Sequence, residues 1–277
     1  MGKFNTYPAA DRLAKTDILL KDTSGSTDTR KITGELLASD LLGMISADMH
    51  RNVYRGKNLG TSLTASQKTA ISSGTFDDIF IGDYWTIGGK SYAVADMDYW
   101  YNHGDTVFTK HHLVLIPTTN MYNAKMNETN ITTGAYIGSA MYTGEYTSDE
   151  EVKGLTPART EIATAFGENL LTHREYLENA VTDGIATAGA WVDFTVDLMS
   201  ETMVYGHRIR STGTVACNSK SQLALFRLKP NFLGRSSVWL CDVVSATNFA
   251  RVDSYGAASG NNASNSLGVR PVFAVGV

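Results

Sequence analysis

Residues 239–277, WLCDVVSATNFARVDSYGAASGNNASNSLGVRPVFAVGV, decide the fold prediction. An apolar and partly β-branched run stands at each end of this stretch, at residues 238–244 and 269–275. Such runs predict two strands that are buried in one core. Between them, 17 of the 24 residues from Ser245 to Gly268 are Ser, Gly, Asn or Ala, which bury little apolar surface. We therefore expect residues 245–268 to lie on the surface, with their ends held by the two strands.

This polar segment has two interpretations. In the first, it is a tolerated surface insertion or a glycine-rich ligand loop. In the second, it is a recognition surface, because Phe249 and Val252 alternate with polar neighbours and Tyr255 precedes the flexible Gly256. Antibody loops use Tyr, Ser, Gly and Asn, since these residues supply contact area and adaptable hydrogen bonds at a modest cost in entropy.

Composition and charge exclude several classes of protein. The 277 residues carry 24 basic and 28 acidic side chains without blocks, for a formal charge of −4, which argues against a nucleic-acid partner. No apolar run approaches the ~20 residues that cross a bilayer, so we expect no membrane insertion. The N-terminus shows no signal peptide, and synthesis should end in the cytoplasm of the producing cell. Cys217 and Cys241 fit no metal motif; two free thiols are the simpler interpretation than a disulfide.

The pattern predicts two domains, residues 1–58 and 59–277, of overall α+β class. In the first, strands at 18–22 and 29–32 should form a hairpin, followed by a helix from Thr33 to about His50. Apolar residues recur along this helix every four positions, from Leu37 to Met49. So small a unit cannot bury that stripe, which must contact the main domain or further copies of itself; we favour self-association. The following NVYRGKNLGTS reads as a linker.

The second domain should combine short helices and strands. A capping box at Thr64 and Gln67 predicts a helix over 65–73, and Gly88-Gly89 predicts a tight hairpin. We also expect a buried strand at 113–116, a helix from Thr156 to about Gly167, and a helix from Thr172 to about Val181. Residues 191–205 carry both strand and helix signals, so their secondary structure is not assigned from the sequence.

Catalytic and metal motifs are not apparent. His111 and His112 would point to opposite faces of one strand and could not share an ion, and His173 falls in an expected helix cap. Asp96 and Asp98 read as turn formers rather than as an acid–base pair. Arg270, in the closing strand, should pair with Asp242 in a structural role.

Several motifs together resemble one family. They are GDYW at 82–85, HHLVLIP at 111–117, MNETN at 126–130, LTHREYL at 171–177, MVYG at 203–206, and the frame WLCDVVSA…GVRP at 239–271. From about residue 64 to the end, the chain resembles the variable proteins of diversity-generating retroelements, which bacteriophages and their bacterial hosts encode. The N-terminal segment is similar to the starts of phage structural proteins such as fibres.

The resemblance implies a C-type-lectin fold of the branch shared with formylglycine-generating enzymes, with a variable region at about 237–271. It implies a phage-encoded, hypervariable receptor-binding protein on the virion surface that binds a host receptor, protein or glycan. The N-terminal segment would attach it to other virion proteins or assemble a homo-oligomer such as a trimer. No cofactor or metal is implied. The positions that the family diversifies correspond here to Val238, Cys241, Thr247, Arg251, Asp253, Ser254, Tyr255, Ala257, Ser259, Gly260, Asn261 and Leu267.

Two other functions stay open. A catalytic relative of the formylglycine-generating enzymes is the first, although Cys217 and Cys241 match no motif of that family. A bacterial surface-display protein is the second, although no signal or lipidation sequence is visible. The Glu-Pro-Asn and Trp-Asn-Asp motifs of calcium-dependent sugar-binding lectins are missing, which argues against calcium-mediated sugar binding.

Overall fold

The computed structural model describes residues 18–22, 29–33, 37, 41, 47–145, 154–211, 213–215 and 221–277. The chain divides into two compact units, Met1–Ser46 and Ala47–Val277. The boundary lies before the expected one because the supposed linker packs on the larger unit. Its Tyr54 and Asn58 form β-bridges with Ile81 and Tyr84.

The smaller unit contains the predicted hairpin. Strand β1 (Ile18–Asp22) pairs antiparallel with β2 (Thr29–Thr33). Of the helix expected from Thr33 to about His50, residues 37 and 41 are described as helical in this unit, and α2 (Ala47–His50) belongs to the larger unit; the rest of residues 34–46 lies outside the described ones. Two side chains of the expected apolar stripe, Leu41 and Met49, are exposed.

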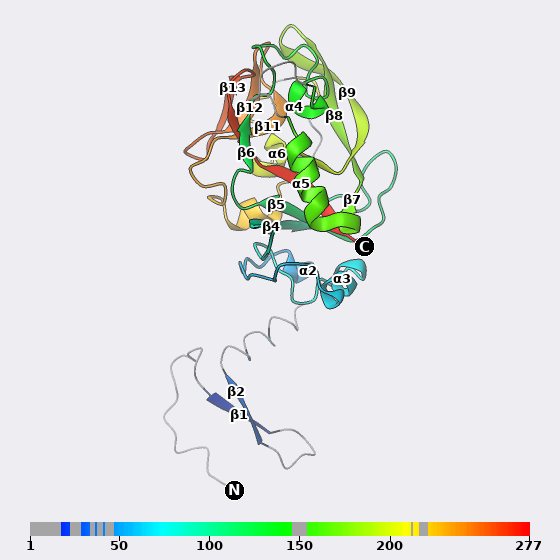
Figure 1. Cartoon of the computed structure of the whole chain (residues 1–277), viewed down its shortest axis with the longest axis vertical. Helices are drawn as coiled ribbons and strands as arrows, with labels where there is room; N and C mark the ends of the chain where they lie inside the picture. The colour runs from blue at the N-terminus through cyan, green and yellow to red at the C-terminus, as the bar shows by residue number, and fades with distance from the viewer. Residues whose placement is uncertain are drawn as a thin grey trace. The chain divides into compact units, whose positions relative to one another are not determined.

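The larger unit contains a six-stranded antiparallel sheet, whose strands β4 and β5 lie above the helices labelled α2 and α3 in Figure 1. Its strands follow the order β10-β15-β5-β4-β3, with β7 also paired to β15. They are β3 (Tyr84–Ile87), β4 (Lys90–Met97), β5 (His112–Pro117), β7 (Leu170–Leu171), β10 (Val196–Leu198) and β15 (Pro271–Gly276). Every residue of β5 and β15 is buried, as the apolar runs at 113–116 and 272–275 predict.

A second sheet holds most of the C-terminal stretch, in the order β13-β12-β11-β14-β6. Its strands are β6 (Tyr122–Ala124), β11 (Val238–Val243), β12 (Asn248–Val252), β13 (Ala258–Asn262) and β14 (Leu267–Val269). The prediction of strands at both ends is confirmed. The expectation that all of 245–268 stays on the surface is wrong in part, because Phe249, Ala250 and Val252 are fully buried in β12.

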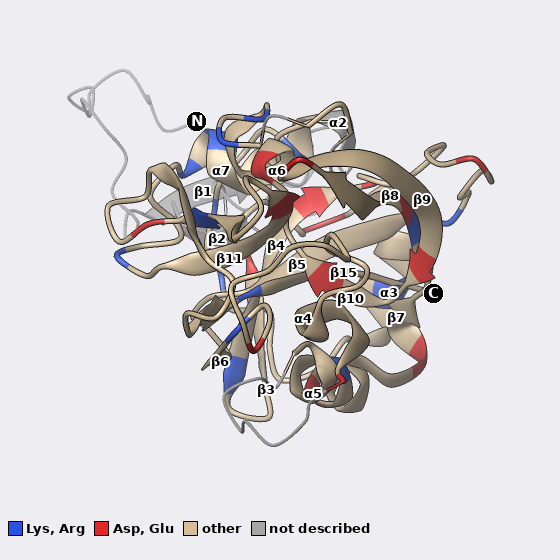
Figure 2. Cartoon of the chain, turned by 90° about the horizontal axis from the view of Figure 1, so that it is seen from above, with Lys and Arg blue, Asp and Glu red and all other residues tan. Residues whose placement is uncertain are grey.

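The remaining sheet is a long hairpin of β8 (His173–Thr182) and β9 (Ile185–Phe194), which curves around one side of the unit (Figure 2). The helix expected from Thr172 to Val181 is therefore wrong. His173, Glu175 and Leu177 are buried at every second position, which is the period of a strand. The missed signal is Asp183-Gly184, whose positive φ angles of 52° and 78° make the tight turn of a two-residue hairpin.

The helices are short. They are α3 (Ala65–Ser72), α4 (Ala140–Thr143), α5 (Thr156–Phe166), α6 (Glu201–Tyr205), α7 (Ala224–Leu228) and the 3-10 turn η2 (Gly167–Asn169). The capping box of α3 and the Gly88-Gly89 hairpin are present as predicted, and α5 ends at Phe166 with Gly167 as its C-cap. No described helix is long and apolar enough to cross a membrane. Basic and acidic residues are spread over the elements (Figure 2).

Several ionisable side chains lie in the interior. Glu178 and Asp242 are fully buried, and each has one carboxylate oxygen without a hydrogen bond from the described residues. Their other oxygens accept from the backbone N–H groups of Val243 and Glu201, at 2.7 and 2.6 Å. Burial raises the pKa of Glu178 to about 9 and that of Asp242 to about 7. Glu178 is therefore protonated in the folded chain at neutral pH, and Asp242 is about half protonated.

His173 also differs from its expected place. Its ring is buried in β8 with its centroid 3.8 Å from that of Trp100, rather than solvated at a helix cap. Burial lowers the pKa of His173 to about 3, so the ring is neutral in the folded state over most of the acidic range.

The expected pair between Arg270 and Asp242 is not formed. Arg270 is 2% exposed, and its Nε and Nη1 find no acceptor in the described part of the chain. Burial alone lowers the pKa of Arg270 to about 10, so it stays charged at neutral pH. The charge at this position opposes folding, because a buried ion gains stability only from partners.

We predict that Arg270→Met raises the free energy of unfolding by about 1 to 3 kcal/mol, since methionine keeps much of the volume and removes an unpaired buried charge. Denaturant unfolding at pH 7 measures the change. Arg270→Ala is the matched control, because it also removes the charge but leaves a cavity, and it should be less stable than Arg270→Met. A large loss of stability in Arg270→Met would show that the guanidinium has a stabilising partner.

We predict that the protein loses stability as pH rises from about 6.5 to 9. In this window the folded state keeps a proton on Glu178 that the unfolded chain releases, at about 1.4 kcal/mol per pH unit, and Asp242 adds to the loss only up to its folded pKa of about 7. His173 does not contribute to this window, because its folded and unfolded forms are both neutral above about pH 6.5.

Glu178→Gln tests this assignment, because glutamine keeps an acceptor for the Val243 N–H and removes the titration. Melting temperatures between pH 6.5 and 9 should fall less steeply in this variant than in the native chain. Glu168→Gln changes a carboxylate whose side chain is 88% exposed and should leave the slope as it is. Equal slopes in Glu178→Gln and the native chain would contradict the assignment.

Candidate ligand-binding surface

The turn between β12 and β13 presents one aromatic side chain to solvent. Asp253 Oδ1 accepts hydrogen bonds from the backbone N–H groups of Tyr255, at 2.8 Å, and Ala257, at 2.9 Å. Gly256 supplies the positive φ of 88° that the turn requires. The Ala257 N–H, with that of Tyr255, lowers the pKa of Asp253 and keeps the carboxylate ionised. Tyr255 itself is 89% exposed, so folding does not account for its presence.

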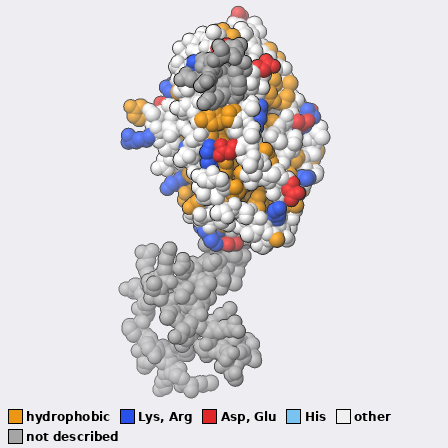
Figure 3. Space-filling model, in the orientation of Figure 1, with side chains coloured by type: hydrophobic (Ala, Val, Ile, Leu, Met, Phe, Trp, Pro, Cys, Tyr) orange, Lys and Arg blue, Asp and Glu red, His pale blue; other side chains and the backbone are white. Residues whose placement is uncertain are grey.

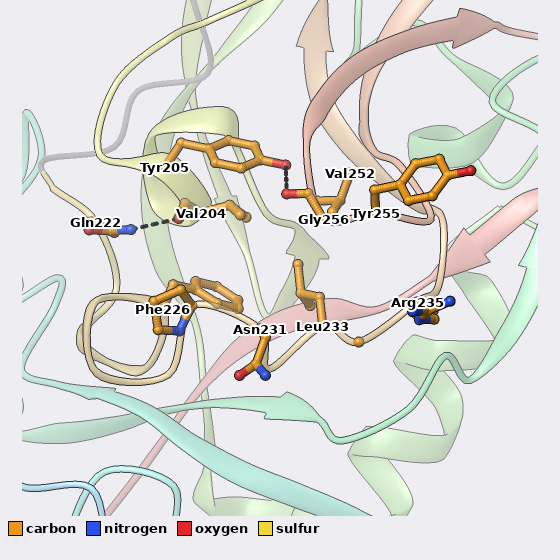
Figure 4. A pocket seen from close by; sticks show the side chains of 12 residues that line it. Val204, Tyr205, Gln222, Phe226, Asn231, Leu233, Arg235, Val252, Tyr255 and Gly256 are labelled. Atoms are coloured by element: carbon orange, nitrogen blue, oxygen red, sulfur yellow. Dashed lines mark hydrogen bonds between the residues drawn. The ribbon is translucent and has the colours of Figure 1, made fainter.

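A cavity of about 560 Å³ lies beside this turn (Figure 4). Side chains from α6, β12, α7 and the loop that follows α7 line it. The apolar ones are Val204, Phe226, Leu233 and Val252, and the polar or mixed ones include Tyr205, Gln222, Asn231, Arg235 and Tyr255. Its volume falls within the range of small-ligand sites, roughly 300 to 1,000 Å³. The arrangement offers an apolar floor with polar groups at the edge.

Hydrogen bonds fix the walls of the cavity. Tyr205 Oη donates to the Gly256 carbonyl oxygen at 3.2 Å, which joins α6 to the Tyr255 turn (Figure 4). Gln222 Nε2 donates to the Val204 carbonyl oxygen at 2.9 Å. These bonds hold the walls together before any ligand binds.

A buried carboxylate positions the chain that follows α6. Glu201 is fully buried and accepts the backbone N–H groups of Ile209, Arg210 and Ser211 at 2.9 to 3.1 Å. Arg210 Nε in turn donates to the Ala258 carbonyl oxygen at 3.2 Å, at the start of β13. The 206–211 loop is thereby tied to the strand that carries many of the predicted variable positions.

Most of the predicted variable positions lie along one edge of the second sheet. Thr247 is in the turn before β12, and Ser259, Gly260 and Asn261 are on the edge strand β13. Asp253, Ser254, Tyr255 and Ala257 form the turn between the two strands. At about 3.3 Å per residue, the five residues of β12 separate the two turns by roughly 17 Å. These eight positions are exposed or half-buried.

The other four predicted positions differ. Val238 and Cys241 are buried in β11, at 0% and 1% exposure. The prediction that these two side chains contact a ligand is therefore wrong for this structure. Arg251 is half-buried opposite Trp239, and its Nη1 donates to Ser237 Oγ at 3.3 Å. Leu267 is half-buried in β14, and β11 and β12 lie between it and the edge strand.

The cavity residues outside the C-terminal stretch were not predicted. Tyr205, Phe226, Leu233 and Arg235 come from segments that precede β11 in the chain. Their local patterns indicate a helix end, a core helix and a loop, and no motif marks them as neighbours. Only the three-dimensional arrangement brings them to Tyr255.

The described residues contain no group of three His, Cys, Asp or Glu side chains placed to hold a metal. His112 begins β5 and is buried, whereas His111 precedes the strand and is half-buried, so the expected placement on opposite faces of one strand does not apply. His111 Nδ1 lies 2.7 Å from Asp98 Oδ2. Cys241 is buried and forms no disulfide with a described residue, and Cys217 lies outside the described residues.

No protein-family model matches the chain, and neither curated proteins nor solved structures give a match. The observed architecture is a mixed helix-and-sheet fold, mostly strand, with curled sheets.

We predict that Asp253→Ala loosens the Tyr255 turn without unfolding the domain. The N–H groups of Tyr255 and Ala257 lose their side-chain acceptor, so both amides should exchange with solvent deuterium several-fold faster. Asp253→Asn is the control, because its side-chain oxygen can still accept both bonds. Unchanged exchange in Asp253→Ala would show that the rest of the chain holds this turn.

Proposed function

We propose that this chain is a phage-encoded, hypervariable receptor-binding protein with a C-type-lectin-like domain. It binds a host surface ligand, protein or glycan, through the edge formed by β13, its two flanking turns and the adjoining cavity. The observation that supports this most directly is Tyr255, an aromatic side chain that is 89% exposed on a turn held by Asp253. Exposed aromatic residues beside a concave site are frequent binding hot spots.

The difference in burial between β12 and β13 supports variability at this edge. Phe249, Ala250 and Val252 are fully buried and anchor β12, whereas no residue of β13 is buried: four are intermediate in burial and Asn262 is exposed. Substitutions at surface positions usually change stability by about 0.5 kcal/mol or less. Side chains of β13 and the two turns can therefore vary while the anchors keep the backbone in place.

The N-terminal unit would attach the protein to the virion or assemble several copies. The exposure of Leu41 in this unit is consistent with a further partner for the predicted stripe, and Met49, which belongs to the same stripe but to the larger unit, is exposed as well. Several copies, such as a trimer on the virion surface, would convert weak single contacts into strong attachment.

We predict that Tyr255→Ala reduces adsorption of the purified protein to host cells by about ten-fold or more, because a hot-spot aromatic contributes more than ~1.4 kcal/mol. Flow cytometry with labelled protein measures adsorption, and the melting temperature should stay unchanged. Val107→Ala is the matched control, since it removes another exposed apolar side chain, 63% exposed, that does not line the cavity.

Undiminished adsorption by Tyr255→Ala would contradict the proposed surface. The neighbouring DNA gives a second check on the proposed diversification. A near-copy of the 3′ end of the gene, differing at adenines in the codons of the eight edge positions and lying beside a reverse transcriptase gene, would support it.

A further inference from the structure

The charges around the cavity are unbalanced. Its lining includes the guanidinium of Arg235 and no Asp or Glu side chain. Arg235 is exposed and forms no hydrogen bond or ion pair with any described residue. A ligand in this cavity therefore meets one uncompensated positive charge and no lining carboxylate.

The nearby carboxylates do not supply the missing partner. Asp253, in the adjoining turn, accepts the backbone N–H groups of Tyr255 and Ala257. Glu201 is fully buried and accepts the N–H groups of the 209–211 segment. Arg210, bound through Nε to the Ala258 carbonyl oxygen, adds a second positive charge close to the same turn. The charged group in the lining itself is the guanidinium of Arg235, which has no ion-pair partner among the described residues and favours an anionic group.

The rest of the lining favours an apolar body for that ligand. Val204, Phe226, Leu233 and Val252 contribute methyl and aromatic groups (Figure 4). The hydroxyl of Tyr205 already donates to Gly256, and the amide of Gln222 already donates to Val204. A ring bearing many hydroxyl groups would leave those that lie over the apolar residues without partners, and unpaired hydroxyls are costly to bury. An aromatic or branched aliphatic side chain finds a matching surface.

We propose that this cavity binds an acidic peptide segment, with a bulky apolar side chain on the floor and an adjacent carboxylate paired with Arg235. The inference rests on the proposed ligand-binding function of the same surface and assigns the chemistry of its ligand. Arginine suits this role because its planar guanidinium can donate two parallel hydrogen bonds to one carboxylate.

Three small probes separate the components of this proposal. N-acetylphenylalanine carries an aromatic body and a carboxylate, its primary amide keeps the body without the charge, and glucuronate keeps the charge on a hydroxylated ring. Each is titrated into the full chain labelled with ¹³C at the Val and Leu methyl groups, and the signals of Leu233 and Val252 report binding at the floor. N-acetylphenylalanine should shift both signals and bind about ten-fold more tightly than its amide.

Arg235→Gln should abolish the preference for N-acetylphenylalanine over its amide and leave amide binding intact. Arg227→Gln is the control, because this exposed arginine of α7 contacts Asn52 and does not line the cavity. It should keep the full preference.

Three results would overturn the proposal. Equal affinities for the acid and the amide would show that the charge is not recognised. Tighter binding of glucuronate than of N-acetylphenylalanine would assign the site to an acidic glycan. Unchanged Leu233 and Val252 signals at several millimolar of each probe would show that the cavity binds none of them. These titrations use no cells, so their failure leaves adsorption through Tyr255 standing, whereas failure of the adsorption test leaves the chemical preference of the cavity standing.

Discussion

Burial of β11 on both of its faces is the constraint on which the larger unit depends. Val238 and Leu240 pack in the core that includes the six-stranded sheet, whereas Trp239, Cys241 and Val243 pack in the second apolar cluster. A strand enclosed in this way cannot slip by one residue without exchanging the contents of two cores. The fixed register of β11 determines the position of its neighbour β12. The position of β12 in turn determines where the edge strand β13 and its flanking turns lie.

The same enclosure explains the distribution of buried charge. A backbone N–H of β11 at Val243 needs an acceptor away from water, and the Glu178 carboxylate provides it. Asp242 accepts in the same manner from the first residue of α6. These acids satisfy backbone groups that the sheet leaves open, and protonation reduces the cost of burying them. Arg270 has no comparable compensation among the described residues.

Local signals in the sequence predicted the elements whose causes are local. The Thr64–Gln67 capping box and the Gly88-Gly89 turn each depend on adjacent residues, and both are present in the structure. The capping pattern at Thr172 and Glu175 was misleading, because burial of alternate residues of β8 outweighed it. The pairing of Arg270 with Asp242 was inferred from the need of a buried charge for a partner, whereas Arg270 lies between β14 and β15 and Asp242 accepts the backbone N–H of Glu201. The sequence likewise predicted the exposed turn at Tyr255 but not the cavity, whose walls come from four separate segments.

The position of β13 at the margin of its sheet has a consequence for colloidal behaviour. An outermost strand leaves one row of backbone groups open to pairing with the same strand of another molecule, which is a route to aggregation. Here the strand reads ASGNN, residues with low propensity for extended pairing, and Arg210 occupies the carbonyl oxygen of its first residue. Replacement of these side chains by valine, isoleucine or phenylalanine would remove that protection. The side chains that β13 can carry are therefore limited by the solubility of the protein as well as by its affinity for a ligand. This limit is strongest at positions 259–261.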